Sequence, residues 1–178
     1  MTKDTYDLVN FDKKTIVLVG HMGCGKSTIG RILSKKLKWE FFDTDKEIEK
    51  KQNKTILEIF KKYGENFFRE KEEFVLKNLL KKNYTVISLG GGALTRKNIR
   101  NMIEKKAISI FLKVDIDILV KRLKNSKNRP LLINTDIKEK ILSLDAERLF
   151  YYNKANIIVM NSERSQKTIS KIMEILKN

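Results

Sequence analysis

Short runs of apolar residues alternate along this chain with longer segments in which apolar residues recur every three or four positions. The short runs predict strands at 15–19, 39–43, 84–89, 107–112 and 156–160. The periodic segments predict helices at about 26–37, 45–51, 55–62, 66–81, 96–105, 115–125, 137–152 and 165–177. Near-continuous apolar runs are typical of strands that a parallel sheet buries on both faces. Their alternation with helices therefore predicts an α/β fold made of βαβ units.

Two segments interrupt this alternation. Three glycines, Gly90–Gly92, directly follow the run at 84–89, and a polar stretch over about 125–136 contains the only proline, Pro130. A loop of this length is long enough to act as a lid over a site. Residues 1–14 form a polar extension, and we expect residues 15–178 to form one domain.

The composition is that of an ordinary globular protein of the cell interior. A chain of 178 residues can bury a core without metal or disulfide staples. Its single cysteine, Cys24, excludes an intrachain disulfide and fits a reducing cytosol. No apolar run reaches the length of a membrane span, and the polar start of the chain does not resemble a signal peptide. We therefore expect a cytoplasmic protein without a membrane partner, and a monomer.

The net charge of +16 comes mostly from lysines that are spread along the whole chain. This distribution is typical of a solvated surface, and we expect no nucleic-acid partner, because no basic cluster is interleaved with aromatic residues. The alternative, a nucleotide-dependent nucleic-acid-binding module, predicts that basic residues gather on one face. Only eight of the basic residues are arginines, so each arginine marks a position where a bidentate fork could be needed.

The segment Gly20–Ser27 fits the pattern G-x-x-x-x-G-K-[S/T] and lies between a predicted strand and a predicted helix. In this context the glycines let successive backbone N–H groups surround phosphate oxygens, and the helix N-terminus adds a favourable dipole. Lys26 would reach the β- and γ-phosphates, and the Ser27 hydroxyl would ligate Mg²⁺. The sequence therefore predicts a nucleotide-binding site.

Two carboxylates, Asp43 and Asp45, stand at the end of the second predicted strand. The C-terminal ends of parallel strands line the ligand crevice, so we expect both beside the phosphate loop. Asp43 could join Ser27 at Mg²⁺, directly or through water, and Asp45 could orient an acceptor hydroxyl for in-line attack. Alternatively, Asp43 or Thr44 only caps the next helix, a role that is compatible with the first.

Six motifs resemble those of the shikimate kinase family in their order and approximate spacing. They are Gly20–Ser27, Asp43-x-Asp45, Gly64-Glu65-x-x-Phe68-Arg69-x-x-Glu72, Gly90–Gly92, Arg129-Pro130-Leu131-Leu132 and Arg148-x-x-x-Tyr152. Only the first is specific alone, but together they span residues 20 to 152. The resemblance implies a P-loop three-layer αβα sandwich similar to nucleoside monophosphate kinases. It also implies a lid and a five-stranded parallel sheet in the order 2-3-1-4-5.

The same resemblance implies transfer of the ATP γ-phosphate to the 3-hydroxyl of shikimate, giving shikimate 3-phosphate and ADP. It implies catalytic roles for Asp45, Lys26 and Arg129, and Mg²⁺ at Ser27 and Asp43. Shikimate would be bound by Asp45, Arg69, Gly90, Gly91, Gly92 and Arg148. ATP would be bound by Gly23, Cys24, Gly25, Lys26, Ser27, Thr28, Arg122, Arg129 and Arg164.

Alternatives stay open for the acceptor. Arg69 could merely pair with Glu72 or Glu73 along its helix, and Arg148 could pair with Asp145. A related kinase for gluconate or a nucleoside monophosphate would share the phosphate loop. Gluconate is the closer rival, because it too carries a carboxylate and hydroxyls.

Two loop residues depart from the family pattern. His21 stands where the family usually has phenylalanine or another bulky apolar residue, and Cys24 occupies a position that is usually small. A catalytic thiol would need a partnering histidine, and His21 is the only one in the chain. We interpret both residues as filling space within the loop.

Overall fold

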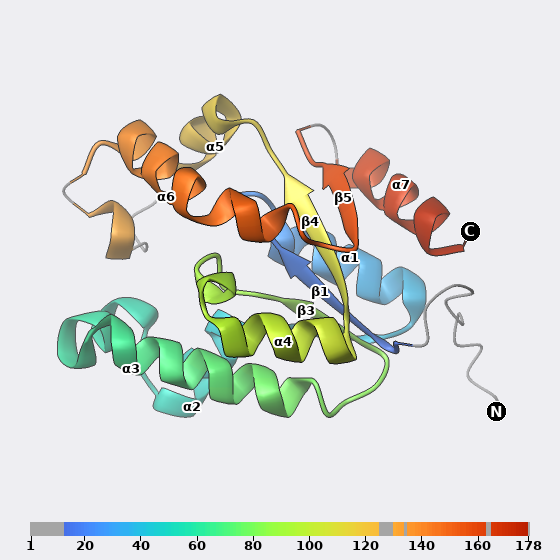
Figure 1. Cartoon of the computed structure of the whole chain (residues 1–178), viewed down its shortest axis with the longest axis horizontal. Coiled ribbons are helices and arrows are strands. Elements are labelled where there is room, and N and C mark those ends of the chain that lie inside the picture. Colours follow the sequence, from blue (N-terminus) through green and yellow to red (C-terminus); the bar gives the residue numbers. More distant parts are fainter. Residues whose placement is uncertain (1–12, 125–129, 134, 163–164, 178) are drawn as a thin grey trace.

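The computed structural model describes residues 13–124, 130–133, 135–162 and 165–177 (Figure 1). At its centre lies one five-stranded sheet in which all neighbouring strands are parallel, in the order β2-β3-β1-β4-β5. The strands are β1 (Thr15–Val19), β2 (Glu40–Asp43), β3 (Thr85–Ser88), β4 (Ile108–Lys113) and β5 (Ile157–Met160). The predicted fold class, the parallel sheet and its strand order are confirmed.

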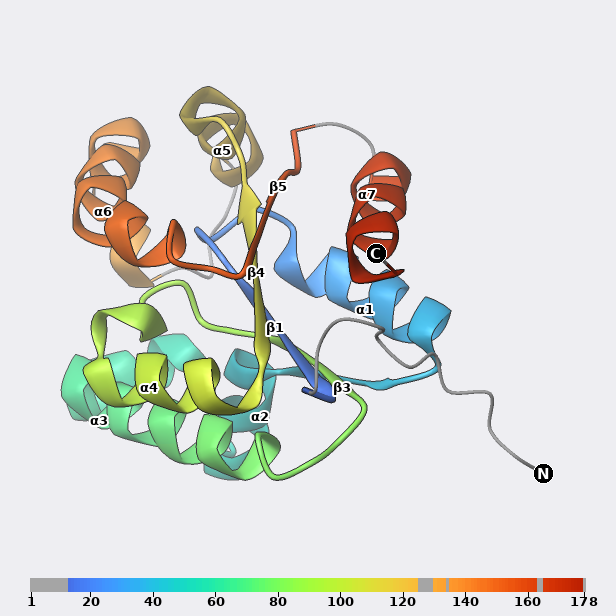
Figure 2. The same ribbon diagram turned by 45° about the vertical axis from the view of Figure 1, so that its right-hand side comes forward.

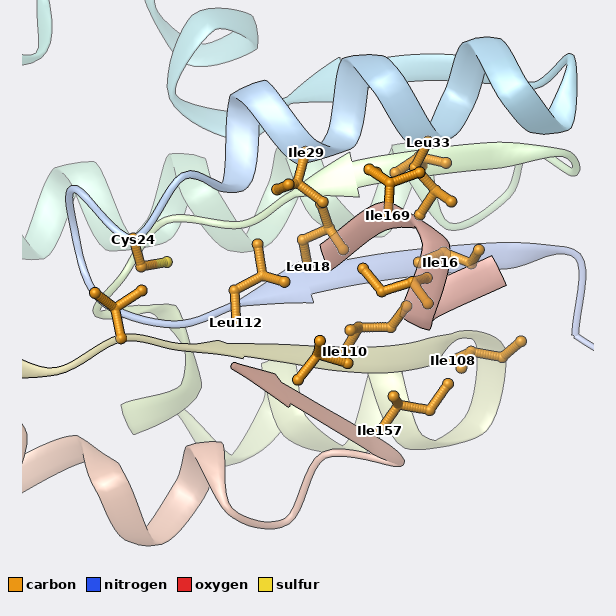
Figure 3. Close-up of a cluster of buried hydrophobic side chains, with 14 of the residues drawn as sticks. Ile16, Leu18, Cys24, Ile29, Leu33, Ile108, Ile110, Leu112, Ile157 and Ile169 are labelled. Atoms are coloured by element: carbon orange, nitrogen blue, oxygen red, sulfur yellow. The ribbon is translucent and has the colours of Figure 1, made fainter. Parts of the chain in front are cut away.

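The near-continuous apolar runs form strands because successive side chains serve two different cores. On β1, Ile16 and Leu18 belong to one buried cluster, whereas Val17 and Val19 belong to a second cluster. Figure 3 shows the first cluster, in which Ile16 and Leu18 lie among side chains of the helices on that face. The sheet is thus covered on both faces, as its apolar pattern predicted.

The helices form the two outer layers of the sandwich (Figures 1 and 2). They are α1 (Lys26–Leu37), α2 (Thr44–Gln52), α3 (Ile56–Leu79), α4 (Lys97–Lys106), α5 (Ile116–Leu123), α6 (Ile137–Tyr152) and α7 (Ser165–Lys177). Helices α1 and α7 pack together over the first cluster, and α2, α3 and α4 bury their apolar faces in the second. Helix α6 packs beside α5, and its last residue, Tyr152, enters the second cluster.

Helix α3 spans most of the segments 55–62 and 66–81, which the sequence predicts as two separate helices. The predicted break between 62 and 66 is present as a kink at Gly64, whose φ of 78° and ψ of 174° are not helical. An L-residue rarely adopts such a positive φ, which explains the glycine. The helix begins with a capping box, in which Thr55 and Glu58 satisfy each other's backbone N–H groups.

Two predicted loops contain short 3₁₀ turns, η1 (Ala93–Thr95) after the triple glycine and η2 (Pro130–Leu132) in the expected lid. The rest of the lid is described only in part, because residues 125–129 and 134 lie outside the described residues, as do residues 1–12. Within the described ranges, each helix is too short or too polar to cross a membrane.

Candidate active site

The predicted site residues gather where β1, β2 and β3 end. The phosphate loop follows β1, Asp43 is the last residue of β2, and Gly90–Gly92 follow β3. The register pairs Asp43 with Ser88 on β3, and Ser88 with Leu18 on β1. Because these strands are parallel, their carboxyl ends share one edge of the sheet, which brings the three segments together.

The phosphate loop is held from behind by a residue far away in the chain. Asn161, just after β5, donates from Nδ2 to the carbonyl of Cys24 at 2.6 Å and accepts from Thr168 Oγ1 at 2.7 Å. Gly25 has a φ of +95°, and a Cβ there would lie 2.7 Å from Asn161 Nδ2. This support could not be predicted from a local pattern, because Asn161 and Cys24 are 137 positions apart in the sequence.

Lys26 lies buried across its own loop. Its Nζ donates to the carbonyl oxygens of Gly20 and His21, at 2.7 Å each. The ammonium group is therefore held at the concave side of the loop by backbone acceptors. Phosphate oxygens that enter the loop would compete for the same N–H groups, which makes Lys26 a ready counter-charge.

Ser27 and Asp43 form the expected pair, and the alternative role of Asp43 is present as well. Ser27 Oγ donates to Asp43 Oδ2 at 2.5 Å. The other oxygen of Asp43 accepts from the backbone N–H groups of Asp45 and Lys46, at 3.1 and 3.4 Å, and so caps α2. One carboxylate thus fixes the start of α2 and faces the serine hydroxyl at the same time.

A pocket beside the phosphate loop collects the remaining polar side chains. It is lined by Met22, Asp45, Ile56, Phe60, Phe68, Arg69, Glu72, Gly90, Gly91, Gly92, Pro130, Leu131 and Arg148. Two arginines and two carboxylates therefore meet in one hollow with apolar walls. Guanidinium groups bind anions and carboxylates accept hydrogen bonds from hydroxyls, so the polar groups of the pocket are complementary to both kinds of group.

Arg69 pairs with Glu72 along its helix, as the alternative allowed, and with Glu65 rather than Glu73, and it still lines the pocket. Its Nη1 donates to Glu72 Oε2 at 2.8 Å, and its Nη2 donates to Glu65 Oε1 at 2.9 Å. Arg69 is 8% exposed and Glu72 is 0% exposed. Burial raises the pKa of the Glu72 carboxyl to about 7, against the opposing effect of the Arg69 charge.

Glu72 lines the pocket, whereas the sequence predicted for it only a possible helix pair with Arg69. The signal was its position three residues after Arg69 within one motif, a spacing that puts both on one helix face. Together the two side chains explain the glycines after β3. A Cβ on Gly90 would lie 2.0 Å from Glu72 Oε1, and one on Gly92 would lie 2.2 Å from Arg69 Nη2.

Arg148, on α6, is buried at the far wall of the pocket. The pairing with Asp145 that the sequence allowed is not the one observed, because Asp145 Oδ1 lies 2.7 Å from His21 Nε2 instead. Arg148 instead pairs with the exposed Glu147 on the same helix, whose carboxylate lies 3.5 Å from Nε. Its side chain also lines the pocket, where its guanidinium group can face a ligand.

Comparison with known proteins identifies the family of this chain. The sequence model of the family described as shikimate kinase matches residues 22–177. The chain belongs to the shikimate kinase family. A shikimate kinase of Bartonella quintana is 44% identical over 163 residues, which cover 92% of this chain and 78% of that protein. One of Cereibacter sphaeroides is 42% identical, over 85% of this chain and 76% of that protein.

Solved structures of the family superpose on most of the chain. Shikimate kinase from Acinetobacter baumannii, in complex with shikimate, has a TM-score of 0.89 at 34% identity, covering 93% of each chain. The enzyme from Aquifex aeolicus has a TM-score of 0.81 at 36% identity, covering 91% of this chain and 95% of that one. A gluconokinase from Sinorhizobium meliloti, with a TM-score of 0.58 at 12% identity, shares the fold alone.

The structure of this shikimate kinase family member describes some of the residues that were predicted to bind ATP. The loop residues Gly23–Thr28 surround the start of α1 as expected. Arg122 lies at the mouth of the loop, where it donates to the carbonyls of Gly23 and Asn161 at 3.3 and 3.1 Å. Arg129 and Arg164 lie outside the described residues.

The two loop residues that depart from the family pattern differ in their contacts. Cys24 packs into the first buried cluster, which agrees with its interpretation as a residue that fills space. His21 does more than fill space, because its ring makes the hydrogen bond to Asp145 described above. His21 and Asp145 are separated by 124 positions, so no local sequence pattern could predict their contact.

Proposed function

We propose that this member of the shikimate kinase family phosphorylates the 3-hydroxyl of shikimate with ATP, releasing ADP and shikimate 3-phosphate. The observation that supports it best is the pocket in which Asp45, Arg69 and Arg148 meet beside the phosphate loop. Shikimate is a small ring with one carboxylate and three hydroxyls, so the polar groups of substrate and pocket match in kind. The roles below are assigned on this basis.

Arg69 and Arg148 would bind the shikimate carboxylate, because a guanidinium group offers a fork of N–H donors that fits a planar anion. Glu65 and Glu72 hold Arg69 by its other N–H groups, so the fork is positioned before the substrate arrives. The backbone of Gly90, Gly91 and Gly92 would close the pocket at short range, since no side chain stands in the way.

Asp45 is the proposed catalytic carboxylate. It stands in the first turn of α2, two residues after the cap residue Asp43, and it lines the pocket. From there it would accept a hydrogen bond from the 3-hydroxyl and orient its oxygen for in-line attack on the γ-phosphate. Most of the rate would come from this positioning and from charge stabilisation, without a covalent intermediate on the protein.

On the nucleotide side, the amides of residues 23–28 would bind the phosphates and Lys26 would neutralise the charge between them. Mg²⁺ would be held by Ser27 and Asp43, whose hydroxyl and carboxylate oxygens are ligands that this ion prefers. When bound, the ion would neutralise charge on the β- and γ-phosphates. Arg122 at the mouth of the loop, Arg129 from the lid and Arg164 complete the proposed ATP contacts.

The decisive test is acceptor-dependent ADP release. Purified enzyme with ATP and Mg²⁺ should release ADP when shikimate is added, and should show little release with gluconate or a nucleoside monophosphate. A Lys26→Ala variant serves as the matched blank. Turnover with gluconate but none with shikimate would reject shikimate as the acceptor, although the protein would still be a kinase.

Lysines do line a hollow at the opposite end of the sheet, where β1, β3 and β4 begin. Lys13, Lys14, Lys81, Lys105 and Lys106 surround it, and among the described residues neither an arginine nor an aromatic side chain lines it. We propose no nucleic-acid function for it, because its described lining offers no side chain on which a base could stack. Retention of single-stranded DNA at physiological salt, lost when these five lysines are replaced, would argue for the alternative.

A further inference from the structure

We propose that His21 and Asp145 are positioning residues that join the nucleotide loop to the helix bearing Arg148, so that bound nucleotide strengthens the binding of the acceptor. The inference rests on the proposed function, since it concerns how the two substrate sites of that reaction communicate. It assigns neither residue a contact with substrate.

The contact between the two residues is direct and only partly exposed to water. His21 Nε2 lies 2.7 Å from Asp145 Oδ1, and the two side chains are 8% and 24% exposed. The edge of the His21 ring also meets the ring of Tyr152, with centroids 5.0 Å apart and planes at 84°. A hydrogen bond and an aromatic contact therefore anchor the same loop residue to α6.

Helix α6 uses a single face for all its contacts with the site. Asp145, Arg148 and Tyr152 are three and four residues apart, a spacing that aligns them along one side of a helix. The Tyr152 hydroxyl donates to the carbonyl of Gly91 at 2.5 Å. The phosphate loop, the acceptor arginine and the glycine run are thus connected through one rigid element.

The other end of this connection is Lys26. Its Nζ donates to the backbone carbonyl of His21 at 2.7 Å. A phosphate group in the loop would draw the ammonium group toward itself and change this contact. His21 would transmit the adjustment to Asp145, and α6 would carry it to Arg148, three residues further along.

The ring of His21 is suited to this role in its neutral form. Burial lowers its pKa, as do the charges of Lys26 and Arg148, while Asp145 acts in the opposite direction. Tyr152, the other titratable side chain against the ring, has a pKa raised by its own burial and stays neutral. A neutral ring beside a carboxylate must carry its proton on Nε2 and donate it to Asp145.

The test measures how much ADP tightens shikimate binding. Calorimetric titration of the whole enzyme with shikimate, with and without saturating ADP and Mg²⁺, gives the ratio of the two dissociation constants. We expect a ratio of about tenfold for the unaltered chain, within the usual range of coupling between sites. In His21→Phe, which keeps a ring but has no N–H to donate, the ratio should fall to about one.

Asp145→Ala breaks the same hydrogen bond at a partly exposed position, so it remains informative if His21→Phe does not fold. In the double variant, the ratio of dissociation constants should fall no further than in either single variant, because each of the three variants removes the same hydrogen bond. His21→Gln, which restores an N–H donor, should recover part of the ratio. A mere loss of thermal stability would not move this ratio or be rescued in this way.

The matched control is Lys138→Met. Lys138 also lies on α6 and pairs with Asp117 of α5 at 3.3 Å, but both side chains are largely exposed. Its ratio should equal that of the unaltered chain. If His21→Phe or Asp145→Ala keeps the ratio of the unaltered chain, or if the losses add in the double variant, the inference is overturned and the proposed function is not. An unaltered chain that does not bind shikimate would overturn the proposed function with it.

Discussion

The two halves of the candidate site are built in different ways. The nucleotide half comes almost entirely from one stretch of chain, Gly20–Thr28, and its main groups are backbone amides and one lysine. The acceptor half is assembled from α2, α3, the glycine run and α6, and its main groups are buried charges. A continuous loop can be read from sequence, whereas a pocket made of distant charges needs the fold.

This difference predicts that damage to one half should spare binding in the other. Asp45→Asn should have the largest effect, because the acceptor hydroxyl loses the carboxylate that orients it. We expect kcat to fall by about 10²–10⁴-fold, while ATP affinity stays close to that of the unaltered chain. Steady-state kinetics and nucleotide titration measure the two. Glu47→Gln, in the same turn of α2, is the control and should keep its kcat.

Lys26→Ala tests the nucleotide half. Loss of a charge placed against the phosphates should lower kcat/KM for ATP by about 10²–10³-fold, while shikimate binds the nucleotide-free enzyme as before. Lys35→Ala, on the exposed side of α1, should leave both quantities unchanged. Loss of shikimate binding in Lys26→Ala would contradict the separation of the halves.

Gly92→Ala tests the acceptor half without removing any charge. The added methyl group would meet Arg69 Nη2 at 2.2 Å and push the guanidinium group aside. Shikimate affinity should weaken by about tenfold or more, the size expected for a lost hydrogen bond to a charged group. ATP affinity should not change.

Gly64→Ala is its control. Its φ of +78° strains any L-residue, but a Cβ there would meet no atom within 4 Å. Stability should drop by about 1–2 kcal/mol, as thermal unfolding would report, and the affinity for shikimate should remain. Equal losses of affinity in both glycine variants would show that Gly92→Ala acts through folding instead of through Arg69.

The smallest expected effect is a pH dependence of stability that arises in the acceptor half. Burial raises the pKa of Glu72 from 4.5 to about 7 in the folded chain. Between these values the folded chain binds the proton and the unfolded chain does not, so this residue's contribution to stability falls as pH rises through that window. Chemical denaturation at several pH values should show that the free energy of unfolding falls less with rising pH in Glu72→Gln than in the unaltered chain. Glu65→Gln, which alters the exposed partner of Arg69, should follow the unaltered chain.

Local patterns predicted much of the fold. The runs at 15–19 and 107–112 identified strands because both faces of the sheet are buried. The helix at 137–152 was predicted with its observed bounds. The break near Gly64 was predicted as two separate helices, because periodicity alone does not reveal that a helix resumes after a kink. Strand order came from family resemblance, since strand pairing is a long-range property.

The site divides in the same way. Ser27 and Asp43 could be paired in advance, since strand ends of a parallel sheet meet at one edge. The support of the loop by Asn161 and the bond of His21 to Asp145 could not be predicted, because each spans more than a hundred residues of sequence. The place of Glu72 in the pocket was missed for another reason: its spacing from Arg69 predicts an ordinary helix pair, and neither its burial nor its position in the pocket follows from that spacing.

His21 is the only histidine in the chain, and it lies between the two halves of the site. In a preparation without a histidine tag, the imidazole region of a magnetic resonance spectrum would therefore contain the signals of one ring. Those signals would report its tautomer and its titration without any engineered label. The loop thus carries a natural spectroscopic reporter, whose response to ADP and to shikimate can be followed one ligand at a time.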